Sequence, residues 1–86
     1  MTAKTWRDWI VEAMGDLGGT AYLEQLYAHL QHIRPGPFTR EWRATVRRTI
    51  ETNSSSSDNW RPGQPDIFYV IGGKGTGHWG LRDTPR

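Results

Sequence analysis

Apolar residues recur every three or four positions in two segments of the first half of the chain. This spacing places them on one face of a helix, so each segment is expected to form a helix that buries that face. The apolar positions are Trp6, Ile10, Met14 and Leu17 in the first segment, and Leu23, Leu26, Tyr27, Leu30 and Ile33 in the second. The pattern predicts a first helix over about 6–17 and a second over about 22–33.

Polar residues, glycines and prolines mark the ends of these two helices. Thr5, followed three residues later by Asp8, has the pattern of a capping box and predicts that the first helix begins directly after Thr5. Gly18 and Gly19 end it, because glycine readily adopts the left-handed conformation that closes a helix. The second helix stops at the sequence Arg-Pro-Gly-Pro over 34–37, since proline lacks the N–H that a helix needs.

A third helix is expected over about 39–52, with Thr39 as its N-cap. The residues of its packing face are Trp42, Val46, Thr49 and Ile50. At about 100° per residue, a different side of the helix carries the arginines. These are Arg40, Arg43 and Arg47, with Arg48 at the far flank. One face of this helix is therefore expected to pack and another to be cationic.

The last third of the chain reads as a loop followed by two strands. Residues 53–65 (NSSSSDNWRPGQP) are polar, serine-rich and contain proline, which is typical of a loop. Residues 66–71 (DIFYVI) and 78–82 (HWGLR) are rich in aromatic and β-branched side chains, and the glycine-rich turn 72–77 (GGKGTG) joins them. We expect a β-hairpin with a flexible tip, and a minimal strand at 20–21.

This order of elements predicts an α+β fold in which three helices lie on one side of a small antiparallel sheet with a C-terminal hairpin. With 86 residues, the chain has room for one compact core, so we expect a single domain over 1–86. A composition with 35% hydrophobic residues and five tryptophans is too apolar for disorder. The expected core consists of Trp6, Ile10, Leu17, Leu26, Leu30, Trp42, Val46, Ile50, Phe68, Trp79 and Leu81.

The composition also limits where the protein acts. The chain has no cysteine, which excludes disulfides and thiolate metal sites and favours a reducing compartment. No apolar run approaches the roughly 20 residues that span a bilayer, and the N-terminus lacks the layout of a secretion signal. We therefore expect a cytoplasmic, nucleoid-associated protein without a membrane partner.

Positive charge is concentrated in one segment. The net charge is only +2, but residues 34–48 contain five arginines and a single acid, Glu41. Residues 1–33 are acidic overall, and residues 49–86 are balanced. Because clustered rather than total charge identifies a nucleic-acid surface, this distribution favours a nucleic-acid partner over a uniformly solvated helix face.

The order of elements, together with several short phrases, resembles winged helix-turn-helix domains, in particular a subgroup found beside restriction and DNA-modification enzymes; the layout is also similar to that of HARE-HTH domains. The phrases cover nearly the whole chain: Trp9-Ile10, Leu17-Gly18-Gly19-x-Ala21, Leu26-Tyr27, Trp42-Arg43-Ala44-Thr45-Val46-Arg47-Arg48, Asn53-Ser54-Ser55, Asp66-Ile67-Phe68-Tyr69 and Gly77-x-Trp79-Gly80-Leu81-Arg82. The resemblance implies that the third helix enters the major groove of double-stranded DNA and that the hairpin, or wing, contacts the backbone or the minor groove.

The arginines of the third helix agree with this role, because guanidinium groups suit both guanine edges and phosphates. Lys74, among the glycines of the hairpin tip, is expected to contact phosphate. Trp60 is expected to cover the open end of the core, with stacking on an extruded or methylated base as the alternative. The expected DNA-binding residues are Thr39, Arg40, Arg43, Ala44, Arg47, Arg48, Ser54, Ser55, Lys74, Thr76 and His78.

The sequence carries no motif for catalysis, metal binding or a cofactor. His29 and His32 lie three residues apart on a helix without a carboxylate arrangement for zinc. The glycines over 72–77 lie between two strands, which is the wrong context for nucleotide binding, and the serines at 54–57 have no positioned base. We expect a DNA-binding domain, not an enzyme, with no cofactor and no metal.

Several alternatives stay open from the sequence. Instead of a stand-alone DNA-binding regulator, the chain could be a protein-interaction module. It could also be the DNA-targeting domain of a modification-dependent nuclease. Sensitivity to base methylation and a nuclease or other protein partner follow from the resemblance alone. The oligomeric state is a monomer or a weak homodimer, since no zipper or apolar patch indicates a stable interface.

Overall fold

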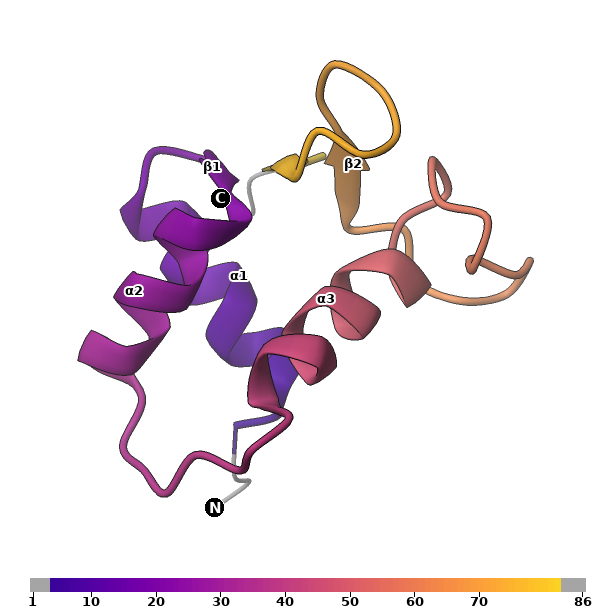
Figure 1. Ribbon diagram of the computed structural model, residues 1–86. Coiled ribbons are helices and arrows are strands. Elements are labelled where there is room, and N and C mark those ends of the chain that lie inside the picture. Colours follow the sequence, from indigo (N-terminus) through magenta and orange to yellow (C-terminus); the bar gives the residue numbers. More distant parts are fainter. Residues whose placement is uncertain (1–3, 83–86) are drawn as a thin grey trace.

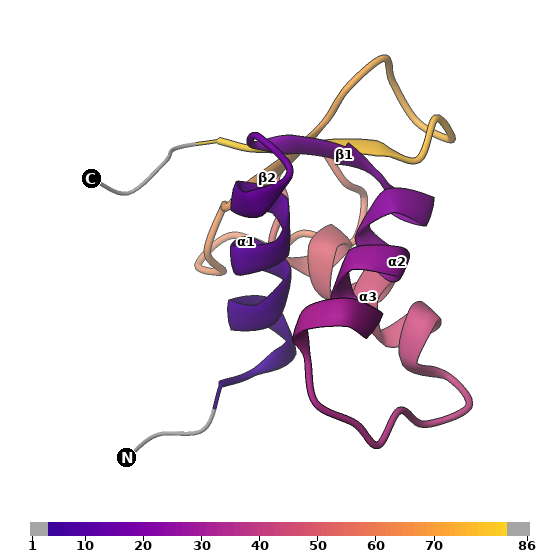
Figure 2. The same ribbon diagram turned by 90° about the vertical axis from the view of Figure 1, so that its left-hand side faces the viewer.

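The computed structural model describes residues 4–82. The elements along the chain are α1 (Trp6–Asp16), β1 (Thr20–Tyr22), α2 (Leu23–Ile33), α3 (Trp42–Thr52), β2 (Phe68–Val70) and β3 (His78–Leu81). The predicted α+β class is confirmed: three helices accompany a three-stranded antiparallel sheet, a layout consistent with a winged helix (Figure 1). The sheet lies across one end of the molecule, with α1 and α2 side by side and α3 behind them (Figure 2).

The capping box predicted for α1 is present. Thr5 Oγ1 accepts a hydrogen bond from the backbone N–H of Asp8, and the Asp8 carboxylate accepts one from the backbone N–H of Thr5. The bonds from Thr5 hold the pKa of Asp8 below its usual value. α1 ends one residue earlier than predicted, with Leu17 as its C-cap. Gly18 and Gly19 follow with φ of 95° and 96°, the left-handed conformation that the sequence leads one to expect.

An arginine fastens the turn between α2 and α3. Arg34 follows the last residue of α2, and its guanidinium lies over the ring of Trp6, 4.1 Å from the ring centroid, and within 5.3 Å of that of Phe38. Arg34 Nη1 donates to the carbonyl oxygens of Pro35 and Pro37. A planar guanidinium is suited to stacking and to bonding two acceptors together, so Arg34 ties the proline turn to α1.

α3 begins later than the sequence predicts. The N-cap is Glu41 and not Thr39, and Glu41 makes no side-chain capping bond. Thr39 instead contributes its carbonyl oxygen, which accepts from the backbone N–H of Trp42 at 3.3 Å. Phe38 packs edge-on against Trp42, with ring centroids 4.8 Å apart, so the backbone turns between these two rings before it becomes helical. The prediction of Thr39 as N-cap was wrong because aromatic packing sets the start.

The side chains of α3 bond back onto its own carbonyl groups. Thr45 Oγ1 donates to the carbonyl oxygen of Glu41, Thr49 Oγ1 to that of Thr45, and Thr52 Oγ1 to that of Thr49. Asn53 Nδ2 donates to the Thr49 carbonyl oxygen at 2.7 Å. Threonine is a weak helix former because its branched Cβ loses rotamer freedom against the preceding turn. The conformation of α3 therefore depends on packing against the rest of the domain.

The sheet has the order β1-β3-β2, so β3 is its central strand. Trp79 of β3 lies opposite Ala21 of β1 and Val70 of β2. The strand predicted over 66–71 is shorter, because the backbone N–H groups of both Ile67 and Phe68 donate to the carbonyl oxygen of Asn53. The loop after α3 thus takes the place of a sheet partner at the start of β2.

Among residues 4–82, twelve apolar residues form the core between the helices and the sheet. The predicted core residues Trp6, Leu17 and Leu81 are only partly buried and pack against its edge. Trp6 lies near the open N-terminal end of α1, where Phe38 and Arg34 cover it in part. The core residues are Ile10, Ala13, Met14, Ala21, Leu26, Tyr27, Leu30, Trp42, Val46, Ile50, Phe68 and Trp79. Within residues 4–82, no helix is both long and apolar enough to cross a membrane.

Candidate nucleic-acid interface

α3 separates a packed stripe from an arginine-bearing side. Trp42, Val46 and Ile50 are buried at successive turns. The arginines of the helix and of the turn before it are all exposed: Arg40, Arg43, Arg47 and Arg48. Among residues 4–82, none of these four guanidinium groups forms an ion pair within 4.0 Å. The side of α3 that does not pack is therefore cationic and uncompensated by close acids.

One of these arginines is held in place by aromatic rings. The guanidinium carbon of Arg43 lies 4.7 Å from the ring centroid of Trp42 and 5.7 Å from that of Tyr27 on α2. Burial raises the pKa of Tyr27, and the charges of Arg47 and Arg43 oppose this shift. Arg43 thus covers the seam between α2 and α3, whereas no aromatic ring lies under Arg40, Arg47 or Arg48 within the described part of the chain.

Two smaller residues predicted at this surface lie beside the arginines. Thr39 is exposed in the turn before α3, and Ala44 is half-buried in its first turns. The short side chain of Ala44 leaves space between the long arginine side chains, so a ligand can approach the helix closely there. Thr39 thus lies just before α3, and Ala44 lies within its first turn.

The hairpin between β2 and β3 lies near the end of α3, but its predicted contact residues have partners within the protein. Lys74 Nζ forms an exposed ion pair with Asp58, 2.5 Å from its carboxylate. Thr76 Oγ1 lies 2.7 Å from the carbonyl oxygen of Ile71 and so closes the base of the hairpin tip. His78 is half-buried and stacks on Tyr22, with ring centroids 4.1 Å apart. Of these residues, Lys74 is the one that projects a charge from the tip.

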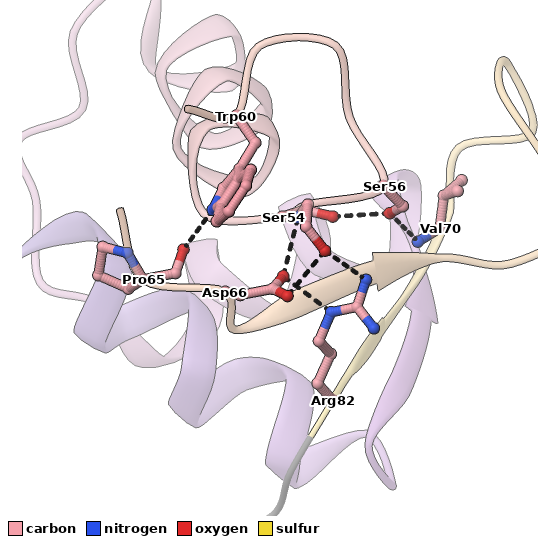
Figure 3. A network of polar contacts seen from close by, with 8 residues as sticks. Ser54, Ser56, Trp60, Pro65, Asp66, Val70 and Arg82 are labelled. Carbon is pink, nitrogen blue, oxygen red and sulfur yellow. Dashed lines mark hydrogen bonds and ion pairs between the residues drawn. The ribbon is translucent and has the colours of Figure 1, made fainter. Parts of the chain in front are cut away.

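The serine run after α3 is part of the fold. Ser54 is fully buried, and its hydroxyl lies 2.8 Å from that of Ser56, which in turn accepts from the backbone N–H of Val70 (Figure 3). The Ser56 hydroxyl therefore takes the place of a neighbouring strand on the outer edge of β2. The burial of Ser54 does not fit the DNA contact predicted for it, since no ligand reaches the hydroxyl in this conformation.

Ser55 belongs to a polar network that links the loop to the end of β3. Figure 3 shows Asp66 and Arg82 of this network. The backbone N–H and the hydroxyl of Ser55 both donate to the carboxylate of Asp66, which also accepts from Arg82 Nε at 2.8 Å. The two bonds from Ser55 are the main reason that the pKa of Asp66 is below its usual value, and Arg82 lowers it further. The network is a structural clamp, and it joins residues 11 to 27 positions apart in sequence.

Trp60 also serves the loop. Its indole N–H donates to the carbonyl oxygen of Pro65 at 3.1 Å (Figure 3). Trp60 is half-buried but does not pack against the core cluster. The expectation that it covers the open end of the core is therefore wrong: it closes the turn over residues 60–65 instead.

A cleft of about 300 Å³ opens between the last turn of α3, the loop and the hairpin. It was not predicted, because its walls come from a helix end, a loop and a hairpin whose relative placement the sequence pattern does not give. The residues that line it are Glu51, Ser56, Ser57, Asp58, Asn59, Val70, Lys74, Gly75, Gly77 and Trp79. A second, wider groove of about 460 Å³ lies between α1 and the strands, lined by Arg7, Val11 and Leu81 among others.

The histidines do not gather into a metal site. His29 Nε2 lies 3.0 Å from the carboxylate of Asp16, and His32 is its nearest aromatic neighbour. In the described part of the chain, no three histidine or carboxylate side chains are grouped as metal ligands.

Comparison of the chain with protein families, curated proteins and solved structures found no match.

Proposed function

We propose that this protein binds double-stranded DNA through the cationic side of α3, assisted by Lys74 on the hairpin. The observation that carries the proposal is the set of four exposed arginines, none of which has a close acidic partner among the described residues. A helix fits the major groove, and arginine bonds to both phosphates and guanine edges. Arg43, stacked on Trp42, is pre-organised, which lowers the entropy lost on binding.

The proposal predicts a steep salt dependence. Each phosphate neutralised by an arginine or lysine adds about −0.9 to the slope of log K against log salt concentration. If Arg40, Arg43, Arg47 and Arg48 each contact one phosphate, the slope is about −3.6. A protein that uses these arginines to bind a neutral partner would show a slope near zero.

Fluorescence polarisation of a labelled random-sequence duplex at several salt concentrations tests the proposal. Arg43→Gln with Arg47→Gln should weaken binding and reduce the size of the slope by about 2, since two phosphate contacts are lost. Arg7→Gln is the control for the single variant Arg47→Gln, because it changes the net charge equally and Arg7 lines the separate groove beside α1. Equal loss in Arg7→Gln and Arg47→Gln, or no binding by folded protein at low salt, would refute the role of α3.

The same titration separates the narrower versions of this function. Duplexes that carry N6-methyladenine or 5-methylcytosine test sensitivity to base methylation, and equal affinity for all duplexes excludes it. Sedimentation of the complex distinguishes a monomer from a dimer on DNA. A protein that folds but binds no duplex would favour the protein-interaction module instead.

A further inference from the structure

The cleft beside α3 has an aromatic and polar interior. Trp79 lines it and is only 7% exposed, yet its indole N–H has no hydrogen-bond acceptor among residues 4–82. Val70 adds an apolar wall. Glu51 of the last turn of α3 contributes a carboxylate, of which Oε1 accepts from Asn59 Nδ2 at 2.8 Å and Oε2 has no protein donor in the described chain. The interior thus offers an unpartnered donor and an unpartnered acceptor beside apolar surface.

The rim of the cleft has different chemistry from its interior. Lys74 stands there with 72% of its side chain exposed and is paired with Asp58, whose side chain is 80% exposed. Exposed ion pairs contribute little free energy, so an incoming phosphate can replace Asp58 on Lys74 at small cost. Gly75 and Gly77 add no side chains to the rim, so a bulky group can pass between them and the loop.

These features restrict what the cleft can hold. The Glu51 carboxylate opposes an anion that enters fully, because like charges repel. A ligand with an anionic part at Lys74 and a neutral, flat part that donates to Glu51 satisfies both regions. Its flat part also needs an acceptor for the Trp79 indole N–H. Each nucleobase has a donor beside an acceptor on its pairing edge, so an unpaired nucleotide meets each requirement.

We propose that this cleft receives an unpaired base from a DNA strand held on α3. The inference rests on the proposed function, since Glu51 lies one helical turn beyond Arg47 and so follows directly on the cationic side of α3. A donor on the pairing edge of the base bonds to Glu51, the adjacent acceptor receives the Trp79 N–H, and the attached phosphate lies at Lys74. A volume of about 300 Å³ is at the small end of the range for small-molecule sites, which suits a single base.

Duplexes with one unpaired nucleotide test the proposal. The wild-type protein is titrated with otherwise identical duplexes that contain a bulged adenine, a bulged abasic nucleotide, or no bulge. The abasic nucleotide keeps the extra phosphate but has no base, so it controls for the interrupted duplex. We expect the adenine bulge to bind about tenfold more tightly than the abasic bulge, the equivalent of one hydrogen bond to a charged group.

Two further measurements link this preference to the cleft. Glu51→Ala should remove it, whereas Glu24→Ala, which deletes an exposed carboxylate on α2, should keep it. Because a variant can fail to fold, the second measurement uses the wild-type protein: the ¹H–¹⁵N signal of the Trp79 indole should shift with the adenine bulge and not with the fully paired duplex.

The outcomes distinguish this inference from the proposed function. Equal binding of all bulged and paired duplexes would overturn the base-binding cleft and leave duplex binding intact. Absence of binding to any duplex would overturn both. If free deoxyadenosine monophosphate shifts the Trp79 signal and bulged duplexes do not, the cleft binds free nucleotides and the proposal of a base supplied by the strand is wrong.

Discussion

Replacement of Ser56 by alanine should destabilise the domain although the serine lies in a loop. The Ser56 hydroxyl accepts the backbone N–H of Val70 at 3.0 Å and shares a bond with the fully buried Ser54 hydroxyl. Two polar groups lose their partner, and an unsatisfied buried group costs about 1–3 kcal/mol. Because Val70 is half-buried, water relieves part of this cost, and we expect a loss of about 2 kcal/mol.

For a domain of this size, this loss corresponds to a decrease in Tm of about 8–16 °C. Urea titration gives the free energy of unfolding, and hydrogen exchange at the Val70 amide reports the local effect, with exchange at least about tenfold faster. Ser57→Ala is the control, because the Ser57 hydroxyl accepts only from the exposed Asn59 backbone and its loss should cost below about 0.5 kcal/mol. Equal stability of the two variants would refute the idea that Ser56 completes the edge of β2.

Three further outcomes test the polar contacts of the fold. Asp66→Asn should lower stability at neutral pH, and the difference should shrink in acid, because the pKa of Asp66 is lowered in the folded protein and its stabilisation is lost as pH falls through that lowered pKa; a stability difference that does not change with pH would contradict this. Thr5→Ala should cost about 1 kcal/mol by urea titration, as the capping box of α1 loses one partner. Arg34→Lys should cost about 1 kcal/mol, since an ammonium cannot stack flat on Trp6 and bond both proline carbonyls; an unchanged Tm would show that the stack is incidental.

The helices were predictable because their signals are local. The spacing of Ile10 and Met14 and the Thr5–Asp8 pair identify α1 without knowledge of its neighbours. The start of α3 could not be predicted in this way. Thr39 satisfies the local rule for an N-cap, but the packing of Phe38 on Trp42 decides where the helix begins. A capping preference of about 1 kcal/mol yields to the burial of two aromatic rings.

The candidate site was predictable only where it lies on one element. The arginine side of α3 follows from helical periodicity, and the structure exposes all its members. The cleft with Trp79 and Glu51, and the clamp of Ser55 with Asp66, join segments that only the sheet and the loop bring together. A serine-rich stretch has the same composition in a flexible linker as in this network. The sequence alone therefore did not indicate that these serines are structural.

The weak helix formers of α3 have a consequence for binding. An isolated 11-residue helix with several β-branched residues is unstable in water, so the spacing of the arginines exists only while Trp42, Val46 and Ile50 are packed. A synthetic peptide with the sequence of α3 would therefore carry the charges without their geometry. By linkage, a ligand that requires this geometry stabilises the whole domain. Conversely, a core substitution that raises the unfolded fraction lowers the apparent affinity for the ligand, although it leaves the binding surface unchanged.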